Sequence, residues 1–301
     1  MRMKKTMAAL VASLAFVAGA GAAISPPDLK DGAAPVIDGT LNDPAWQKAV
    51  VMELDQAVIP LRPAITGTKT TLRFLLGAGK LYIGAECLFP PGFPPRGQQR
   101  EHDAPVFEDE SLELFVAPNG GPNPAVYYHF ALNTCGSKTE RKILDPAWNA
   151  DWPSAVSVGQ DRWTAEMVIP LAALGGDNAP AQYWQINACR NIYDARGSFA
   201  QGMTLARPGY QGPSVLLTCG PVGAPALLAA VNVTLAEMEG LKAYLAGPDK
   251  KQFKQLTKYR NKLEAAKDAA IPANDAITIL ETAWKNAGKL ENTIILNYMF
   301  E

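Results

Sequence analysis

Four carboxylates stand close together in the segment VFEDESLELFVAPN (residues 106–119): Glu108, Asp109, Glu110 and Glu113. Carboxylates at this density suit three kinds of chemistry, namely acid catalysis, metal binding and acceptance of hydrogen bonds from sugar hydroxyl groups. Glycoside hydrolysis needs two carboxyl groups about 5 to 9 Å apart across the scissile bond. Neighbouring side chains of an extended chain mostly face different ways, so the pattern does not favour a catalytic pair.

The rest of the chain supplies no nucleophile constellation. It has no GxSxG motif and no Cys/His signature, and its only histidines are His102 and His129. We therefore expect a protein that is not an enzyme.

The sequence gives only weak evidence for a metal site. Asp and Glu side chains with backbone carbonyls in loops suit calcium, and the loops REHDAP and GGDNAP contain such atoms without the EF-hand spacing. The sequence defines no complete metal site. Of the four carboxylates, Glu110 is a candidate loop or metal ligand, whereas Glu108 and Asp109 are expected to form a solvated strand entrance. A haem site is a further hypothesis, and it would draw an axial pair from His102, His129 and Met203.

The apolar run that follows the carboxylates is typical of a strand, in which successive side chains point to opposite faces. Leu112, Leu114 and Val116 then face a core, and Glu113 faces away from it. On the partner strand, three polar or aromatic side chains share the face of Glu113, namely Tyr127, His129 and Asn133. Such a face is a candidate binding surface, although it also describes the solvated side of an ordinary antiparallel sheet.

From Pro35 to about Cys219, short β-type runs alternate with turns rich in Gly, Pro, Asn and Asp. TTLRFLLGAGKLYIGAECLF indicates two strands around a Gly-containing turn, and SLELFVAPNGGPNPAVYYHFALN repeats that plan with a longer loop. DRWTAEMVIP and YWQINACRNI add further strands. Strands at this spacing, without helices between them, predict a mainly β fold, an antiparallel β-sandwich of the immunoglobulin or jelly-roll type.

After Pro225 the apolar residues recur at helical spacing, in three segments separated by Gly247-Pro248 and by Pro272. The predicted apolar stripes are Leu235, Met238, Leu241 and Leu245; Phe253, Leu256, Tyr259 and Leu263; and Ile277, Leu280, Trp284 and Ile294. We predict a sandwich domain over residues 24–224 and a bundle-like helical region over residues 225–301.

The chain begins with basic residues, an Ala/Val/Leu run and small residues up to Ala23. This order is typical of a secretory signal peptide over residues 1–23, and the run is short and weakly apolar for a membrane anchor. We therefore expect export to the periplasm or the medium, and no membrane span after cleavage. The net charge of -1 gives no electrostatic reason to expect nucleic acid as a partner.

Four cysteines are spread through the β region without CxxC spacing, namely Cys87, Cys135, Cys189 and Cys219. In an oxidising compartment they allow up to two disulfides, and buried free thiols are the alternative. The sequence does not decide between these states.

Six segments of the β region occur in the order found in family 9 carbohydrate-binding modules. They are VIDGTLNDPAWQKA, KLYIGAECLF, VFEDESLELFVAPNG, YYHFALNTCG, RWTAEMVIPLAALG and YWQINACRN. The chain resembles that family over about Pro35 to Cys219. The resemblance implies a β-sandwich with structural calcium, and a site that holds the end of a glucan or xylan chain between two Trp rings.

The resemblance also implies particular site residues. Phe107 takes the place of the first stacking Trp, and Glu113 that of a hydroxyl-binding Glu. Asn133 is retained, Asn187 lies where the family has a ligand-binding Gln, and His129 shares their face. Two positions depart from the family, since Ala131 replaces an Arg and Leu205 aligns with the second Trp. Weaker or altered sugar binding is the expected result.

Trp148 and Trp152, in the loop DPAWNADW, are a candidate replacement platform, and packing over a sandwich edge explains them equally. Trp46, Trp163 and Trp184 are assigned to the core. The predicted function is an exported, non-catalytic carbohydrate-binding protein. The alternative is an envelope structural or assembly protein, in which the sandwich is a scaffold and the helices dock a protein partner.

Overall fold

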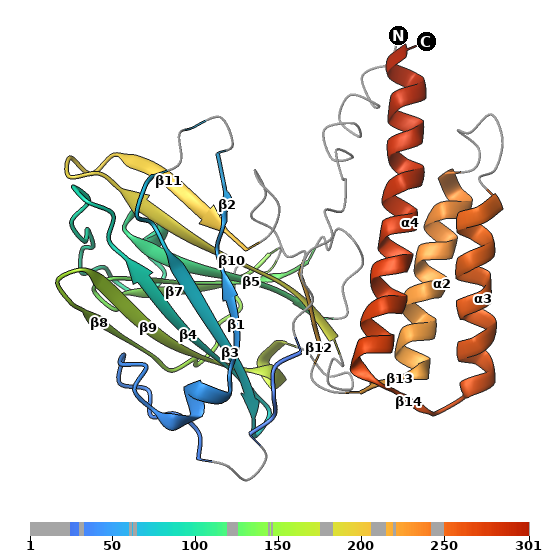
Figure 1. The fold of residues 1–301 in the computed structure, drawn as a ribbon, viewed down its shortest axis with the longest axis horizontal. Coiled ribbons are helices and arrows are strands. Elements are labelled where there is room, and N and C mark those ends of the chain that lie inside the picture. The colour runs from blue at the N-terminus through green and yellow to red at the C-terminus, as the bar shows by residue number, and fades with distance from the viewer. Residues whose placement is uncertain are drawn as a thin grey trace. The chain divides into compact units, whose positions relative to one another are not determined.

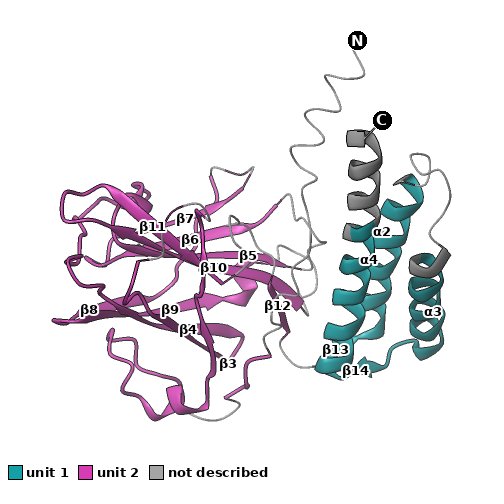
Figure 2. Ribbon diagram, turned by 45° about the horizontal axis from the view of Figure 1, so that its top comes forward, with its two compact units in different colours: residues 1–21, 220–301 teal, residues 22–219 magenta. Residues whose placement is uncertain are grey.

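The computed structural model describes residues 25–29, 33–59, 62, 65–118, 126–143, 145, 147–174, 183–205, 215–218, 221–241 and 250–300, with the side chains of 241, 250–252, 288 and 290–300 left out. The predicted signal peptide lies outside these ranges. The chain divides into a β unit, residues 22–219, and a helical unit that contains residues 220–301 (Figure 2). The division falls a few residues before the predicted one.

One sheet of the β unit has five antiparallel strands in the order β1-β3-β4-β9-β8 (Figure 1). Their bounds are β1 Val50–Glu53, β3 Thr70–Gly77, β4 Lys80–Leu88, β8 Ser154–Val158 and β9 Arg162–Pro170. The predicted hairpin is β3 and β4, joined by Ala78 and Gly79. Both residues have positive φ, 48° and 71°, which is the conformation of a two-residue type I′ turn that matches the strand twist.

The second sheet has seven strands in the order β2-β11-β10-β5-β6-β7, with β12 also paired to β10. Their bounds are β2 Gln56–Ala57, β5 Ser111–Pro118, β6 Tyr128–Asn133, β7 Lys138–Lys142, β10 Tyr183–Tyr193, β11 Phe199–Thr204 and β12 Val215–Thr218. All of these pairs are antiparallel. A short 3-10 helix, η2 (Val106–Glu108), leads into β5.

The core lies between the two sheets, as the strand periods predict. Leu112, Leu114 and Val116 are buried in it together with Tyr128, Phe130 and Leu132 of β6. Trp163 and Trp184 are core residues, as assigned. Trp46 is buried in a smaller cluster, where its Nε1 donates to Glu166 Oε1 at 2.8 Å. The prediction of an antiparallel β-sandwich is confirmed.

A buried ion pair crosses this core. Arg190 donates from Nε to Glu110 Oε1 at 2.7 Å, and Trp163 Nε1 donates to the same oxygen at 3.2 Å. The suggestion from sequence that Glu110 is a loop or metal ligand is therefore wrong. Because Glu110 points into the core, its neighbour Asp109 points to the opposite side of the chain.

The helical unit contains α2 Ala224–Leu241, α3 Lys250–Ala266 and α4 Ala273–Phe300. Two short strands, β13 Val222–Gly223 and β14 Ala270–Ile271, pair at the start of α2 and α4. Predicted stripe residues are buried on each helix, among them Leu235, Met238, Leu256, Leu263, Leu280 and Trp284. Leu245 lies outside the described residues. No helix of the described chain is long and apolar enough to cross a membrane.

Candidate functional site

The outer face of the seven-stranded sheet brings together four of the predicted site residues. Glu113 on β5 pairs with Ala131 on β6 and with Cys189 on β10. His129 and Asn187 pair with Phe115, two residues along β5, and therefore point to the same face as Glu113. Asn133 pairs with Ser111 on that face too. The side-chain period of two was sufficient to place this set.

Glu113 lies at the centre of a hydrogen-bonded chain. Its Oε2 is 2.7 Å from His129 Nε2, and its Oε1 accepts from Asn191 Nδ2 at 2.8 Å. The His129 ring stacks on Phe115, with centroids 4.4 Å apart and planes within 1°. Glu113 and His129 are buried, with side chains 7% and 10% exposed. These contacts hold the Glu113 carboxylate in one orientation at the floor of the face.

Phe107 provides a half-buried aromatic ring beside the hydrogen-bonded residues around Glu113. Its centroid is 6.3 Å from that of His129, and the guanidinium of Arg141 lies 5.5 Å from the ring centre. Arg141 is on β7 opposite His129, so it points to the same face. Arg141 thus places a guanidinium on the face that carries Glu113 and His129. Arg141 was not among the predicted site residues, because no strand was predicted there from the sequence.

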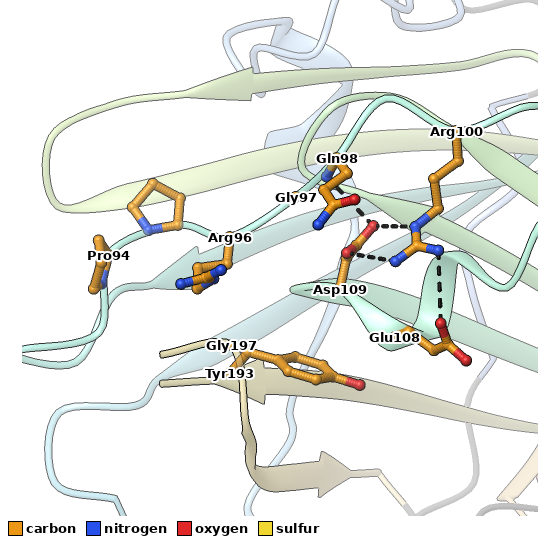
Figure 3. Close-up of a pocket in the computed structure, with 10 residues that line it drawn as sticks. Pro94, Arg96, Gly97, Gln98, Arg100, Glu108, Asp109, Tyr193 and Gly197 are labelled. Atoms are coloured by element: carbon orange, nitrogen blue, oxygen red, sulfur yellow. Dashed lines mark hydrogen bonds and ion pairs between the residues drawn. The ribbon is translucent and has the colours of Figure 1, made fainter. Parts of the chain in front are cut away.

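A polar cavity of about 580 Å³ opens beside Glu108 and Asp109, the two residues that follow Phe107 in the chain (Figure 3). The residues that line it are Pro94, Pro95, Arg96, Gly97, Gln98, Arg100, Glu108, Asp109, Tyr193 and Gly197. Tyr193 connects the cavity to the site, because its hydroxyl donates to the Phe107 carbonyl at 3.0 Å. Burial and the charges of Glu108, Asp109 and Glu113 raise the pKa of the Tyr193 hydroxyl, so it stays protonated as a donor.

Asp109 lines this cavity and Asn133 holds Asp109 in place, so neither residue offers a free hydrogen-bonding surface. Arg100 donates to both Asp109 oxygens, at 2.7 and 2.9 Å (Figure 3). Asn133 donates to Asp109 Oδ2 at 2.8 Å and to the Gln98 carbonyl at 2.9 Å. Its Oδ1 accepts the N–H groups of residues 135 and 137, both at 3.0 Å. Asn133 therefore positions the cavity wall, and the sequence-based view of Asp109 as a solvated strand entrance is wrong.

Burial alone would raise the pKa of Asp109. The hydrogen bonds from Arg100 and Asn133 outweigh burial and hold that pKa below its ordinary value of 3.8. Asp109 is therefore ionised at neutral pH. Arg100 also lies 3.6 Å from Glu108, so its charge is shared between the two carboxylates, and Arg96 is the other cation that lines the cavity.

Asn187 is on the same face, but it is buried more deeply than a ligand-binding amide needs to be. It is fully buried, and its Oδ1 accepts from Thr204 Oγ1 at 3.0 Å. Asn191, four residues further along β10, is the amide that contacts Glu113. The strand period places both amides on one face, so Asn191 was predictable from YWQINACRNI once Glu113 had been chosen.

Trp148 and Trp152 do not form the platform predicted for them. Trp152 is fully buried in the sandwich core, where its Nε1 donates to Glu140 Oε2 at 2.8 Å. Trp148 packs edge-on against Tyr128 and Phe130, whose side chains point to the core. Both Trp residues thus lie on the side of the sheet away from Glu113. Packing over the sandwich edge, the alternative interpretation, is correct.

Ala131 and Leu205, the two positions at which the sequence departs from the family it resembles, lie in different surroundings. Ala131 is fully buried directly beside Glu113. Leu205 packs against the core and therefore presents no side chain to the outer face. Met203 also packs against the core, whereas His129 points outward, so this pair cannot form the haem site considered from sequence.

The described cysteines carry free thiols. Cys87 and Cys189 are buried, and Cys135 is exposed. Burial raises the pKa of Cys87 to about 12 and also raises the pKa of Cys189. Cys219 lies outside the described residues.

Calcium remains a prediction of the resemblance. Within the described residues, one group of three side chains could hold a metal ion, and it includes a histidine, which is not a calcium ligand.

Comparison with known proteins supports the fold. No protein-family model matches the chain, and no curated protein matches it. A candidate carbohydrate-binding protein of Bacteroides uniformis aligns with a TM-score of 0.50 and 16% identity, over 66% of this chain and 100% of its own. At that identity the alignment shows a shared fold.

Two structures of a family 9 carbohydrate-binding module from Caldicellulosiruptor kristjanssonii also align. One is in complex with cellotriose and the other with glucose. Each has a TM-score of 0.46 and 16% identity, over 65% of this chain and 92% or 94% of its own. The solved structures that match this chain therefore include members of the family that its sequence resembles.

Proposed function

We propose that the protein binds carbohydrate on the outer face of the seven-stranded sheet, around Phe107 and Glu113, without acting on it chemically. One arrangement carries the proposal: the half-buried Phe107 ring lies beside His129, His129 holds the Glu113 carboxylate, and a polar cavity of about 580 Å³ is lined by Glu108 and Asp109, which follow Phe107 in the chain. Ligand pockets typically enclose about 300 to 1,000 Å³, so this cavity can take a sugar unit.

Phe107 matches the apolar C–H face of a pyranose, and Glu113 matches its hydroxyl groups. The Phe107 ring offers an apolar face to the C–H groups of the sugar, a contact comparable to the ~0.5 to 1.5 kcal/mol of an aromatic pair. Each Glu113 oxygen accepts one protein hydrogen bond and keeps a lone pair for a sugar hydroxyl. Hydrogen bonds to a charged group contribute about 1.5 to 3 kcal/mol.

The expected ligand is the end of a glucan-like or xylan-like chain, bound more weakly than by family members with two Trp rings. Phe107 is smaller than Trp, and Leu205, an aliphatic residue that packs against the core, cannot act as a second ring. Arg141 supplies a guanidinium on the face where Ala131 lacks one. A single stack and a single cation favour a shallow, low-affinity site.

Isothermal titration of the purified chain with cello- and xylo-oligosaccharides tests the proposal. We expect Phe107→Ala to weaken binding by about 3- to 10-fold, which corresponds to the loss of one stacking contact. Glu113→Gln keeps the shape of the side chain and should weaken binding further, since the charged acceptor is lost. Trp148→Phe is the matched aromatic control, because Trp148 lies on the other side of the sheet.

The proposal fails if no oligosaccharide binds at millimolar concentration. It also fails if Trp148→Phe removes binding while Phe107→Ala leaves it intact.

Export to the periplasm or the medium is part of the proposal, supported by the first 23 residues of the sequence. N-terminal sequencing of the mature protein should find a start close to residue 24, and an intact Met1 in the cytoplasm would contradict it.

No described feature favours the alternative of a partner-docking scaffold. In the helical unit, Val233 is the one large apolar side chain that is exposed among those described.

A further inference from the structure

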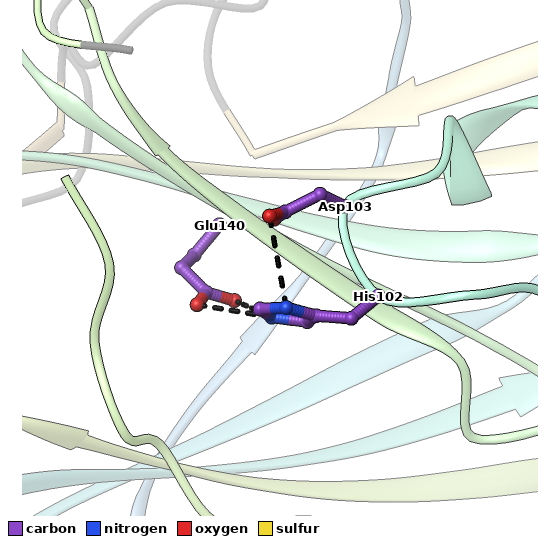
Figure 4. A group of neighbouring side chains, drawn as sticks. All are labelled: His102, Asp103 and Glu140. Carbon is purple, nitrogen blue, oxygen red and sulfur yellow. Dashed lines mark hydrogen bonds and ion pairs between the residues drawn. The ribbon is translucent and has the colours of Figure 1, made fainter. Parts of the chain in front are cut away.

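His102, Asp103 and Glu140 form a cluster of neighbouring side chains (Figure 4). It is distinct from the proposed sugar site around Phe107 and Glu113. Glu140 is on β7 opposite Phe130, so it points to the core side of the sheet, whereas Glu113 points outward. His102 and Asp103 come from the segment that leads to Phe107. One ligand atom from each of the three residues lies within 4.8 Å of the others.

Glu140 is a buried carboxylate without a permanent cation beside it. Its side chain is 1% exposed, and its protein donors are the uncharged Trp152 Nε1 at 2.8 Å and the Ala150 N–H at 3.5 Å. Within the described chain, the basic group that contacts it is His102. A buried charge that lacks a compensating cation is unfavourable, so a cation bound at this position would stabilise Glu140.

The orientation of His102 matches that of a metal-binding histidine. Its Nε2 is 3.1 Å from each oxygen of Glu140, and its Nδ1 is 3.6 Å from Asp103 Oδ2. A neutral imidazole has one N–H and one lone pair. With the proton on Nδ1, toward Asp103, the lone pair of Nε2 and the carboxylate of Glu140 face one another. A carboxylate behind one ring nitrogen and a cation at the other is the usual arrangement around metal-bound histidine.

We propose that His102 Nε2 and the Glu140 carboxylate bind a divalent ion of the zinc type, with Asp103 orienting the imidazole. Ligand bonds of about 2.0 to 2.2 Å, applied to the 3.1 Å separation, give an N–metal–O angle of roughly 100°. This angle lies between those of octahedral and tetrahedral coordination. Imidazole with carboxylate suits zinc, cobalt or nickel, whereas calcium takes oxygen ligands.

Space for the remaining ligands is present beside the cluster. A cavity of about 380 Å³ is lined by Asp103, Glu140, Asp145 and Trp148, among others. Water molecules in this cavity would complete the coordination. The bound ion would join β7 to the segment that leads to Phe107.

The test uses the full chain without a histidine tag, titrated with zinc chloride by calorimetry and with cobalt chloride by visible absorption. The chain has two histidines, so His102→Gln and His129→Gln form a matched pair. We expect one zinc ion per chain, at least about tenfold weaker binding in His102→Gln, and unchanged binding in His129→Gln. Asp103→Asn should weaken binding about 10- to 100-fold, as loss of an orienting carboxylate does.

Gln keeps an N–H donor for Glu140, so His102→Gln should stay folded in the absence of metal, which its melting curve checks. The cobalt spectrum of the wild type should indicate nitrogen ligation that His102→Gln loses. The proposal is overturned if zinc does not bind at millimolar concentration, if His129→Gln is the variant that loses it, or if equimolar calcium displaces it.

Discussion

Replacing Glu110 with alanine should lower the free energy of unfolding by about 3 to 5 kcal/mol, because it leaves a buried guanidinium without its counter-charge. The Arg190 side chain is 0% exposed and Glu110 is 2% exposed. Two guanidinium nitrogens of Arg190, Nε and Nη2, lie 2.7 Å from Glu110 Oε1. Trp163 Nε1 would lose its acceptor as well, at 3.2 Å.

Two further variants separate the charge from the packing. Burial raises the pKa of Glu110, while the charge of Arg190 acts in the opposite direction. If the pair is ionised at neutral pH, Glu110→Gln should cost nearly as much as Glu110→Ala, although it keeps the shape. The double variant Glu110→Leu, Arg190→Met removes both charges, and replacement of a buried pair by apolar residues is often neutral or stabilising by about 1 to 4 kcal/mol.

Urea unfolding at pH 7, followed by circular dichroism and tryptophan fluorescence, measures these differences. The free energies are comparable if the denaturant dependence is the same in each variant. A loss of less than about 1 kcal/mol in Glu110→Ala, or a double variant as unstable as the sum of the single ones, would refute the reasoning.

Two other predictions follow from ionisation states. The folded-state pKa of Asp109 is lowered, so its contribution to stability is present above the ordinary value of 3.8 and is lost as pH falls through the lower folded value. Wild type should therefore lose more stability than Asp109→Asn in acid, and equal acid melting curves would contradict the Arg100 contact. In a brief alkylation of the native protein with peptide mapping, Cys135 should react while Cys87 and Cys189 stay unmodified. Equal labelling of the three would show that the buried positions are wrong.

The periodicity of apolar residues predicted the features that depend on local sequence, namely the faces of the strands, the hairpins and the helical stripes. The period of two placed Glu113, His129 and Asn133 on one face, because a residue's neighbours at i and i+2 must point the same way. The hairpins, the core Trp residues and the helical stripes followed from the same kind of pattern. These features depend on residues close together in sequence.

What periodicity could not predict depends on long-range contacts. Glu110 was misassigned because its partner, Arg190, is 80 positions away and meets it only once β5 pairs with β10. Trp152 was misassigned because burial of a loop Trp depends on how the loop closes over the sandwich edge. Asn133 shows a third limit, since its side chain has four partners within the protein. The residue type was compatible with ligand binding and with a structural role.

The position of a bound sugar tests the central claim most directly. A crystal structure of the protein with a cello- or xylo-oligosaccharide should show a pyranose lying against the Phe107 ring, with a hydroxyl donating to Glu113. Sugar bound beside Trp148, on the core side of β7, would contradict the assignment of the outer face, as would Phe107 and Glu113 lying far from the ligand.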